Sequence, residues 1–119
     1  MKLTRVIMRL ARNPDAPQGD DSQGYVLMAP LDGDGHLDLE LWRKDPRACT
    51  VRRFHPDPDE VADGWLTHRG ANWFFHYDEE DEGPDEPVYR LGEHRIRAGA
   101  YLTIHEADGD DHTYVVIEA

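Results

Sequence analysis

The last part of the chain, residues 99–119, reads GAYLTIHEADGDDHTYVVIEA and carries the strongest fold signal in the sequence. Two runs rich in β-branched and aromatic residues, at 101–105 and 112–118, flank the dipeptide Asp108-Gly109. Because Asp-Gly favours the tight turn of a β-hairpin, this stretch predicts two antiparallel strands. We expect the other strands to gather around this closing hairpin.

The length of the hairpin loop decides which side chains share a face, because a shift of one residue exchanges the two faces of a strand. Leu102 and Ile104 share one face of the first strand. An even loop joins this face to Val115 and Ile117, which makes it wholly aliphatic, and we favour this register. The opposite face then carries Tyr101, Thr103, His105, His112 and Tyr114. An odd loop would instead place Leu102 and Ile104 with His112, Tyr114 and Val116.

Earlier segments extend the β pattern. Strands are expected at 3–11, 24–31, 49–55, 65–69, 72–77 and 87–91, and a short helix at 38–44. Two of these are ambiguous, since residues 3–11 also fit a helical face and residues 37–44 also alternate as a strand would. The chain therefore predicts a mainly β single domain, a small antiparallel barrel or strongly bent sheet of about six to eight strands with one short helix.

Composition narrows the class of protein. A chain of 119 residues can support one hydrophobic core and argues for one domain. The formal net charge of −12 makes nucleic acid and anionic membranes poor partners, because both are polyanions. Cys49 is the only cysteine, which fits a reducing compartment, and arginines interrupt the apolar N-terminal run, so no signal peptide is indicated. We therefore expect a cytoplasmic protein.

Short strings spread over nearly the whole chain resemble a protein family. They are GY at 24–25, APLD at 29–32, GH at 35–36, VRRF at 51–54, FHYD at 75–78 and YLTI at 101–104, with Asp108-Gly109 and His112. In these strings the chain is similar to a family of small uncharacterised proteobacterial proteins with no assigned function. The resemblance therefore implies no catalytic residue.

Histidines are frequent, but their spacing is not that of a metal site. The seven are His36, His55, His68, His76, His94, His105 and His112. No HxH or HExxH string occurs, and Cys49 has no second cysteine beside it. We therefore predict no metal, no cofactor and no catalytic residue. Strands 65–69 and 72–77 are expected to form a second hairpin across residues 70–71. We expect His105 and His112 to lie on one face, and His68 to face His76 across this second hairpin.

Aromatic side chains are the better lead to a function, although filling of the core is the competing interpretation. We predict a binding surface made by Trp65, Trp73, Tyr77, Tyr89, His105 and His112. The expected function is a non-enzymatic binding or protein-interaction module, and the alternative is a small metal-dependent enzyme that uses histidine and carboxylate side chains.

Two features suggest the kind of partner. The run Asp78–Glu86 is strongly acidic and favours a basic protein or peptide. Pro30 either ends the strand at 24–31 or confines it to an edge of the sheet, and an edge strand could pair with another chain. The sequence gives no indication of the oligomeric state.

Overall fold

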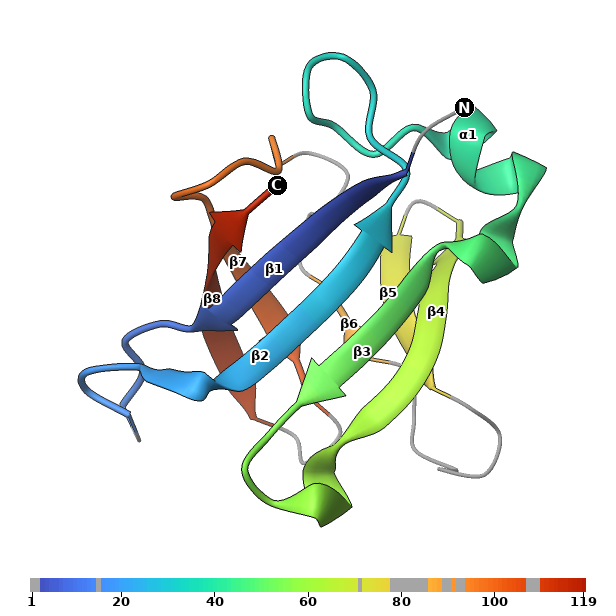
Figure 1. The fold of residues 1–119 in the computed structure, drawn as a ribbon. Coiled ribbons are helices and arrows are strands. Elements are labelled where there is room, and N and C mark those ends of the chain that lie inside the picture. The colour runs from blue at the N-terminus through green and yellow to red at the C-terminus, as the bar shows by residue number, and fades with distance from the viewer. Residues whose placement is uncertain are drawn as a thin grey trace.

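The sheet grows from the alternation of buried and solvent-facing residues along each strand (Figure 1). The computed structural model describes residues 3–14, 16–70, 72–77, 86–88, 91, 94–106 and 110–119. The strands are β1 (Thr4–Leu10), β2 (Asp20–Ala29), β3 (Thr50–Phe54), β4 (Ala62–Arg69), β5 (Asn72–Tyr77), β6 (Glu86–Pro87), β7 (Tyr101–His105) and β8 (Asp111–Glu118). The helix of the described residues is α1 (Leu39–Lys44).

All paired strands are antiparallel, and their order in the sheet is β6-β5-β4-β3-β2-β1-β8-β7. The sheet is strongly curled into a half-barrel, and one bridge between Val88 and Ile104 brings the two ends of the strand order together. The predicted mainly β fold with a strongly bent sheet and one short helix is confirmed.

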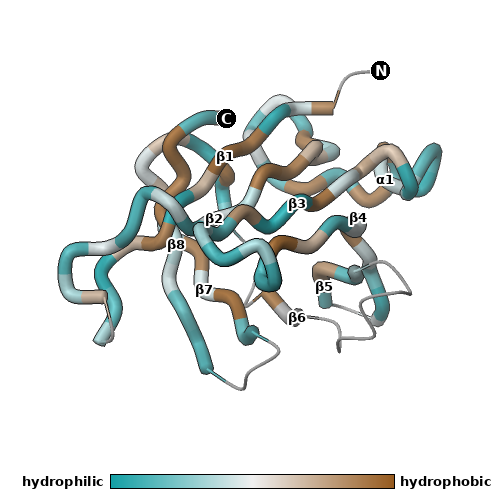
Figure 2. Tube along the Cα trace, turned by 60° about the horizontal axis from the view of Figure 1, so that its bottom comes forward, coloured by the Kyte–Doolittle hydropathy of each residue, from teal (hydrophilic) through white to brown (hydrophobic). Residues whose placement is uncertain are grey.

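The concave side of the curled sheet holds the core. Figure 2 shows hydrophobic and hydrophilic residues alternating along the strands. The largest fully buried side chains include Met8, Tyr25, Phe75, Ile104 and Tyr114. Two glycines allow strands to approach closely, because a Cβ at Gly24 would overlap the carbonyl oxygen of Met8 and one at Gly64 that of His76.

Both ambiguous segments resolve as favoured. Residues 3–11 contain the strand β1, and 38–44 contain the helix α1. The carboxylate of Asp38 caps α1 by accepting from the amide nitrogens of Glu40 and Leu41, at 3.0 and 3.2 Å. The indole nitrogen of Trp42 donates to the carbonyl oxygen of Leu66 at 2.9 Å and fixes α1 to β4. No helix among the described residues is long and apolar enough to span a membrane.

The register predicted for the closing hairpin is wrong. Leu102 lies opposite Tyr114 and Ile104 opposite His112, so residues 106–110, an odd number, connect the two strands. The inner face therefore takes the Tyr114 and Val116 side chains, and Ile117 points outward with 41% exposure. The preference for an all-aliphatic inner face did not decide the register. Tyr114 can face inward because its hydroxyl donates to a buried carboxylate, which is described below.

The interpretation of 24–31 as an edge strand is also wrong, because β2 lies between β1 and β3. Its last residue is Ala29, so Pro30 follows the strand and takes no donor away from the sheet. The carbonyl oxygen of Pro30 accepts from the amide of Asp38 at 2.7 Å and leads the chain toward α1. The strand β2 also begins at Asp20, earlier than the expected start at residue 24.

Candidate functional site

A buried carboxylate, Glu106, lies directly after β7. The residue is only 3% exposed, which is rare for a glutamate. Its backbone amide donates to the carbonyl oxygen of Asp110 at 3.0 Å, just before β8. The odd loop of the hairpin thus directs Glu106 into the core rather than to solvent.

Four side chains from three strands contact this carboxylate. The hydroxyl of Tyr25 on β2 donates to Oε2 at 3.1 Å, and the hydroxyl of Tyr114 on β8 donates to Oε1 at 2.8 Å. Nδ1 of His112 lies 2.6 Å from Oε1, and Nη2 of Arg53 on β3 lies 2.8 Å from Oε2. We call these five residues the Glu106 cluster.

The cluster compensates the cost of removing a carboxylate from water. An unpaired buried charge is strongly unfavourable, whereas a charge with a cation and several hydrogen bonds is tolerated. Arg53 supplies the positive charge, and the two phenols supply neutral donors. Burial and the negative charge of Glu106 raise the pKa of Tyr114 far above its usual range, so this phenol keeps its proton.

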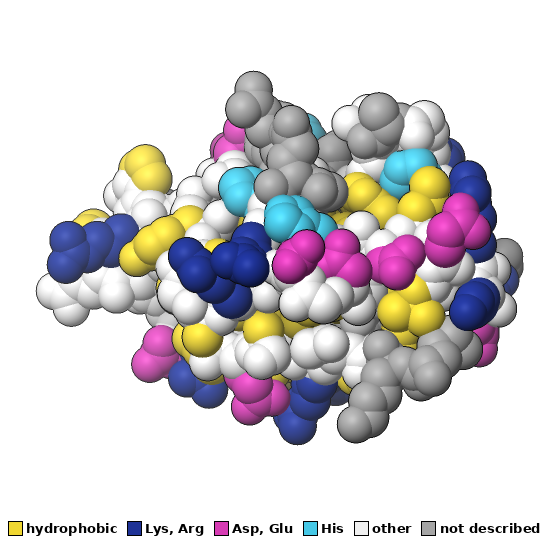
Figure 3. All heavy atoms as spheres, turned by 90° about the horizontal axis from the view of Figure 1, so that it is seen from above, with side chains coloured by type: hydrophobic (Ala, Val, Ile, Leu, Met, Phe, Trp, Pro, Cys, Tyr) yellow, Lys and Arg dark blue, Asp and Glu magenta, His cyan; other side chains and the backbone are white. Residues whose placement is uncertain are grey.

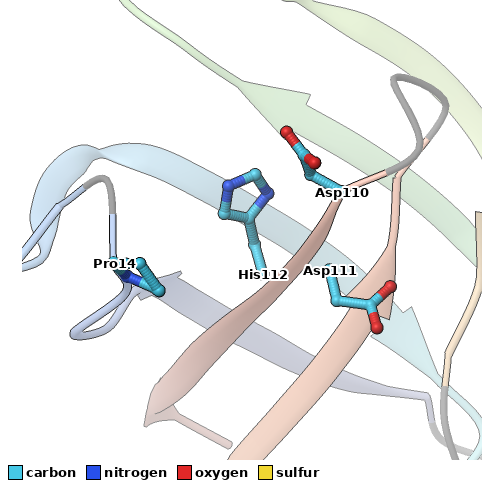
Figure 4. Close-up of a pocket in the computed structure, with 4 residues that line it drawn as sticks. All are labelled: Pro14, Asp110, Asp111 and His112. Atoms are coloured by element: carbon cyan, nitrogen blue, oxygen red, sulfur yellow. The ribbon is translucent and has the colours of Figure 1, made fainter.

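His112 connects the Glu106 cluster to a surface pocket of about 270 Å³. The pocket is lined by Pro14, Asp110, Asp111 and His112. Figure 4 shows the imidazole of His112 lying between Pro14 and Asp110, while the carboxylate of Asp111 points away from the ring. The His112 side chain is 13% exposed, so it spans from the core to the pocket.

Asn13 fixes the other wall of this pocket. Its side-chain amide donates to the carbonyl oxygens of Ala11 and Thr113 at 2.9 and 3.0 Å, and its Oδ1 accepts from the Thr113 amide at 2.9 Å. These bonds tie the chain before Pro14 to β8. The pocket is therefore held between two segments that are far apart in sequence, since Asn13 and Thr113 are separated by 100 positions.

The geometry gives His112 a fixed orientation. A carboxylate that holds one ring nitrogen sets the direction in which the rest of the imidazole points. Such a ring can bind a hydrogen-bonding or cationic ligand, or can transfer a proton. Within the described ranges no group of three or more histidine, cysteine, aspartate or glutamate side chains is arranged to hold a metal ion.

The structure does not bring the predicted binding surface together. Trp73 and Tyr77 are buried on the inner face of β5, whereas Trp65 lies on the outer face beside His76, with ring centroids 5.0 Å apart. Arg47 lies 4.0 Å from the centroid of the Trp65 ring. Tyr89 lies outside the described residues.

Both predicted histidine pairs are wrong. His105 pairs with Asp111 and His112 with Ile104, so the two histidines point to opposite faces of the hairpin. His68 pairs with Trp73, and His76 with Trp65, which separates them in the same way. In each case the residue directly opposite one histidine lies an odd number of positions from the other histidine, so the two histidine side chains point to opposite faces of the sheet.

Sequence reasoning missed most of the Glu106 cluster. Of its members it singled out His112 and placed Tyr114 on the outer face. One available signal was Tyr25, which lies two positions before Leu27 on β2. The two side chains therefore share the buried face of the strand. A buried phenol needs a hydrogen-bond partner, which directs attention to a polar group inside the core.

The surface around the strand ends is mixed in character. Figure 3 shows acidic, basic and histidine side chains next to one another, with hydrophobic side chains in small separate areas. Most of the acidic run 78–86 lies outside the described residues.

A comparison of the chain with known proteins finds no matching family model, no matching curated protein and no matching solved structure.

Proposed function

We propose that the domain is a non-enzymatic binding module that receives a basic side chain of a protein or peptide in the pocket beside His112. The observation that supports this most is the pocket itself, which combines Asp110 with a histidine oriented by buried Glu106, whereas the carboxylate of Asp111 is bound to His105 at 2.7 Å. The hydrogen bonds between Asn13 and Thr113 hold the chain beside Pro14 to β8, so little ordering is needed on this side when a ligand enters.

The size of the pocket favours a side chain over a larger ligand. Sites for small molecules usually have volumes of about 300–1,000 Å³. The pocket beside His112 has a volume of about 270 Å³, which suits one lysine or arginine side chain. A protein or peptide partner would supply the rest of its binding energy through contacts around the rim.

Charge supports a basic partner. The carboxylate of Asp110 lies at the pocket of a chain with a formal charge of −12. The negative field of such a chain raises the association rate of a cationic ligand and is screened by salt. The same field opposes nucleic acid and anionic membranes.

Isothermal titration calorimetry with a short peptide of arginine and lysine tests this function. Asp110→Asn should weaken binding by about tenfold, as expected for the loss of one charge-assisted contact. Glu40→Gln, on α1, changes the charge equally and should leave the affinity unchanged. Absence of binding, or an equal effect of the two substitutions, would contradict the proposal.

A small metal-dependent enzyme is the second candidate, and the contact of 2.6 Å between His112 and Glu106 favours it. A carboxylate that orients a histidine is common around metal ligands and in proton transfer. Elemental analysis of untagged protein purified without chelator tests this candidate. Stoichiometric zinc, manganese or iron that is lost in His112→Gln would favour the enzyme over the binding module.

A further inference from the structure

Tyr101 is an exposed aromatic residue at the start of β7. Its exposure is 62%, the higher of the two values among the large hydrophobic residues that face solvent in the described chain. The ring lies on the outer face of the hairpin, opposite Val115 and on the same face as Ile117. Exposed tyrosines with apolar neighbours are typical of binding surfaces.

Two hollows adjoin Tyr101. The first, of about 340 Å³, has Arg12, Asp21, Tyr101 and Val115 among its lining residues. The second, of about 580 Å³, is lined by His94, Arg95 and residues 97–101. Tyr101 therefore separates two depressions, and we call Tyr101 with these two hollows the Tyr101 surface.

The charge of the Tyr101 surface is opposite to that of the chain. Arg12 lies in the first hollow and Arg97 in the second, and neither guanidinium forms an ion pair or a side-chain hydrogen bond with the described residues. Among the residues that line the two hollows, Asp21 is the one carboxylate, and it lies in the first hollow. In a chain with 25 acidic and 13 basic residues, arginines without acidic partners are unexpected at one place.

Neighbouring arginines strengthen this contrast. Arg9 lies opposite Val115 in the sheet, and its Nε is buried without a hydrogen-bond partner. Arg95 donates from Nε to the carbonyl oxygen of Asp34 at 2.7 Å, which fixes this arginine beside the second hollow. A carboxylate ligand would supply an ionic partner for Arg12 and Arg97, whose guanidinium groups have none within the described fold.

We propose that the Tyr101 surface binds an acidic peptide segment, with an apolar side chain against Tyr101 and Val115 and a carboxylate toward Arg12 or Arg97. A peptide is favoured over nucleic acid because the net charge of −12 repels a continuous phosphate backbone more strongly than a few carboxylates. This surface is separate from the pocket beside His112 and takes a ligand of opposite charge.

Fluorescence anisotropy tests the proposal with a short fluorescein-labelled peptide of alternating glutamate and leucine. Saturable binding is expected, and Tyr101→Ala, Arg12→Gln and Arg97→Gln should each weaken it by about tenfold. Arg43→Gln, an arginine on α1 that pairs with Glu40 at 2.9 Å, removes the same charge and should have no effect. Asp110→Asn should also leave this binding intact, which separates the Tyr101 surface from the proposed function.

Three results would overturn the proposal. They are absence of saturable binding, an equal loss of affinity in Arg43→Gln and Arg97→Gln, and tighter binding of a single-stranded oligothymidine than of the acidic peptide. A matched peptide of alternating lysine and leucine should bind more weakly than the glutamate peptide in the Asp110→Asn background. Because Tyr101 is exposed, Tyr101→Ala should keep the thermal unfolding midpoint of the parent protein, and a large drop would assign Tyr101 to stability instead.

Discussion

The rings of Tyr25 and Tyr114 meet edge to face with centroids 5.0 Å apart, and both hydroxyls donate to the carboxylate of Glu106. Tyr25 belongs to β2 and Tyr114 to β8, and β1 lies between these strands in the sheet. The two tyrosines therefore fasten the closing hairpin to the centre of the sheet across its concave side. This contact also orients Glu106, which in turn holds His112 at the pocket.

Replacing Glu106 by glutamine should destabilise the protein strongly. The substitution keeps the shape of the side chain but removes the negative charge that pairs with Nη2 of Arg53, whose side chain is 17% exposed. Breaking one side of a buried ion pair costs about 3–5 kcal/mol. Urea unfolding of Glu106→Gln should show a loss of this size. Glu40→Gln, which removes an exposed contact with Arg43, should change the free energy of unfolding by less than about 1 kcal/mol, and equal losses would argue against the Glu106 cluster.

The hairpin register predicts unequal effects for two isoleucines. Ile104 is fully buried, so Ile104→Ala should reduce the free energy of unfolding by about 2–5 kcal/mol. Ile117 is 41% exposed on the outer face, so Ile117→Ala should cost less than about 1.5 kcal/mol. Urea denaturation of both variants measures the difference. A similar cost for the two would favour the register in which both face inward.

High pH should unfold the protein through Tyr114. The pKa of this phenol is raised in the folded state by burial and by the charge of Glu106, so the unfolded chain releases the proton first. Its contribution to stability is complete below the unfolded pKa of about 10 and is lost as the pH rises above it. In Tyr114→Phe the unfolding free energy should fall less steeply with pH above that value. Identical slopes in the two proteins would show that Tyr114 does not control alkaline unfolding.

Cys49 should react slowly with thiol reagents. Burial, and secondarily the negative charge of Asp45, raises the pKa of its thiol to about 11, and the thiolate is the reactive form. Modification by a chromogenic disulfide at neutral pH should therefore be slow in the folded protein and fast in urea. Rapid stoichiometric modification without denaturant would contradict the burial of Cys49.

Much of the strand layout could be predicted because period-two alternation and turn residues are local signals. The β4–β5 hairpin across residues 70–71 and the helix capped by Asp38 followed from such signals, and the structure confirms both. Pro30 misled the prediction of an edge strand because a proline that follows a strand cannot be distinguished by sequence from one that interrupts it.

The candidate site was harder to predict because it depends on contacts between distant parts of the chain. Glu106 is one of 25 acidic residues, and although it continues the inner row of Leu102 and Ile104, a charged residue at the end of a strand is normally expected to face solvent. Its burial depends on the odd loop and on Tyr25, which is separated from it by 81 positions in sequence. The all-aliphatic face looked favourable only while the hydrogen-bond partner of Tyr114 was unknown. The same register error accounts for the wrong pairing of His105 with His112, whereas the confirmed turn at 70–71 by itself places His68 opposite Trp73 and not opposite His76.

Glu106 holds His112 at the pocket beside Asp110, where we propose that a basic side chain binds. Amide chemical shifts of isotope-labelled protein, followed during titration with the arginine and lysine peptide, test it most directly. The account predicts saturable shifts concentrated at Asn13 and at Asp110, Asp111 and His112, which are lost in Asp110→Asn. Shifts that avoid these residues, or that persist unchanged in Asp110→Asn, would contradict it.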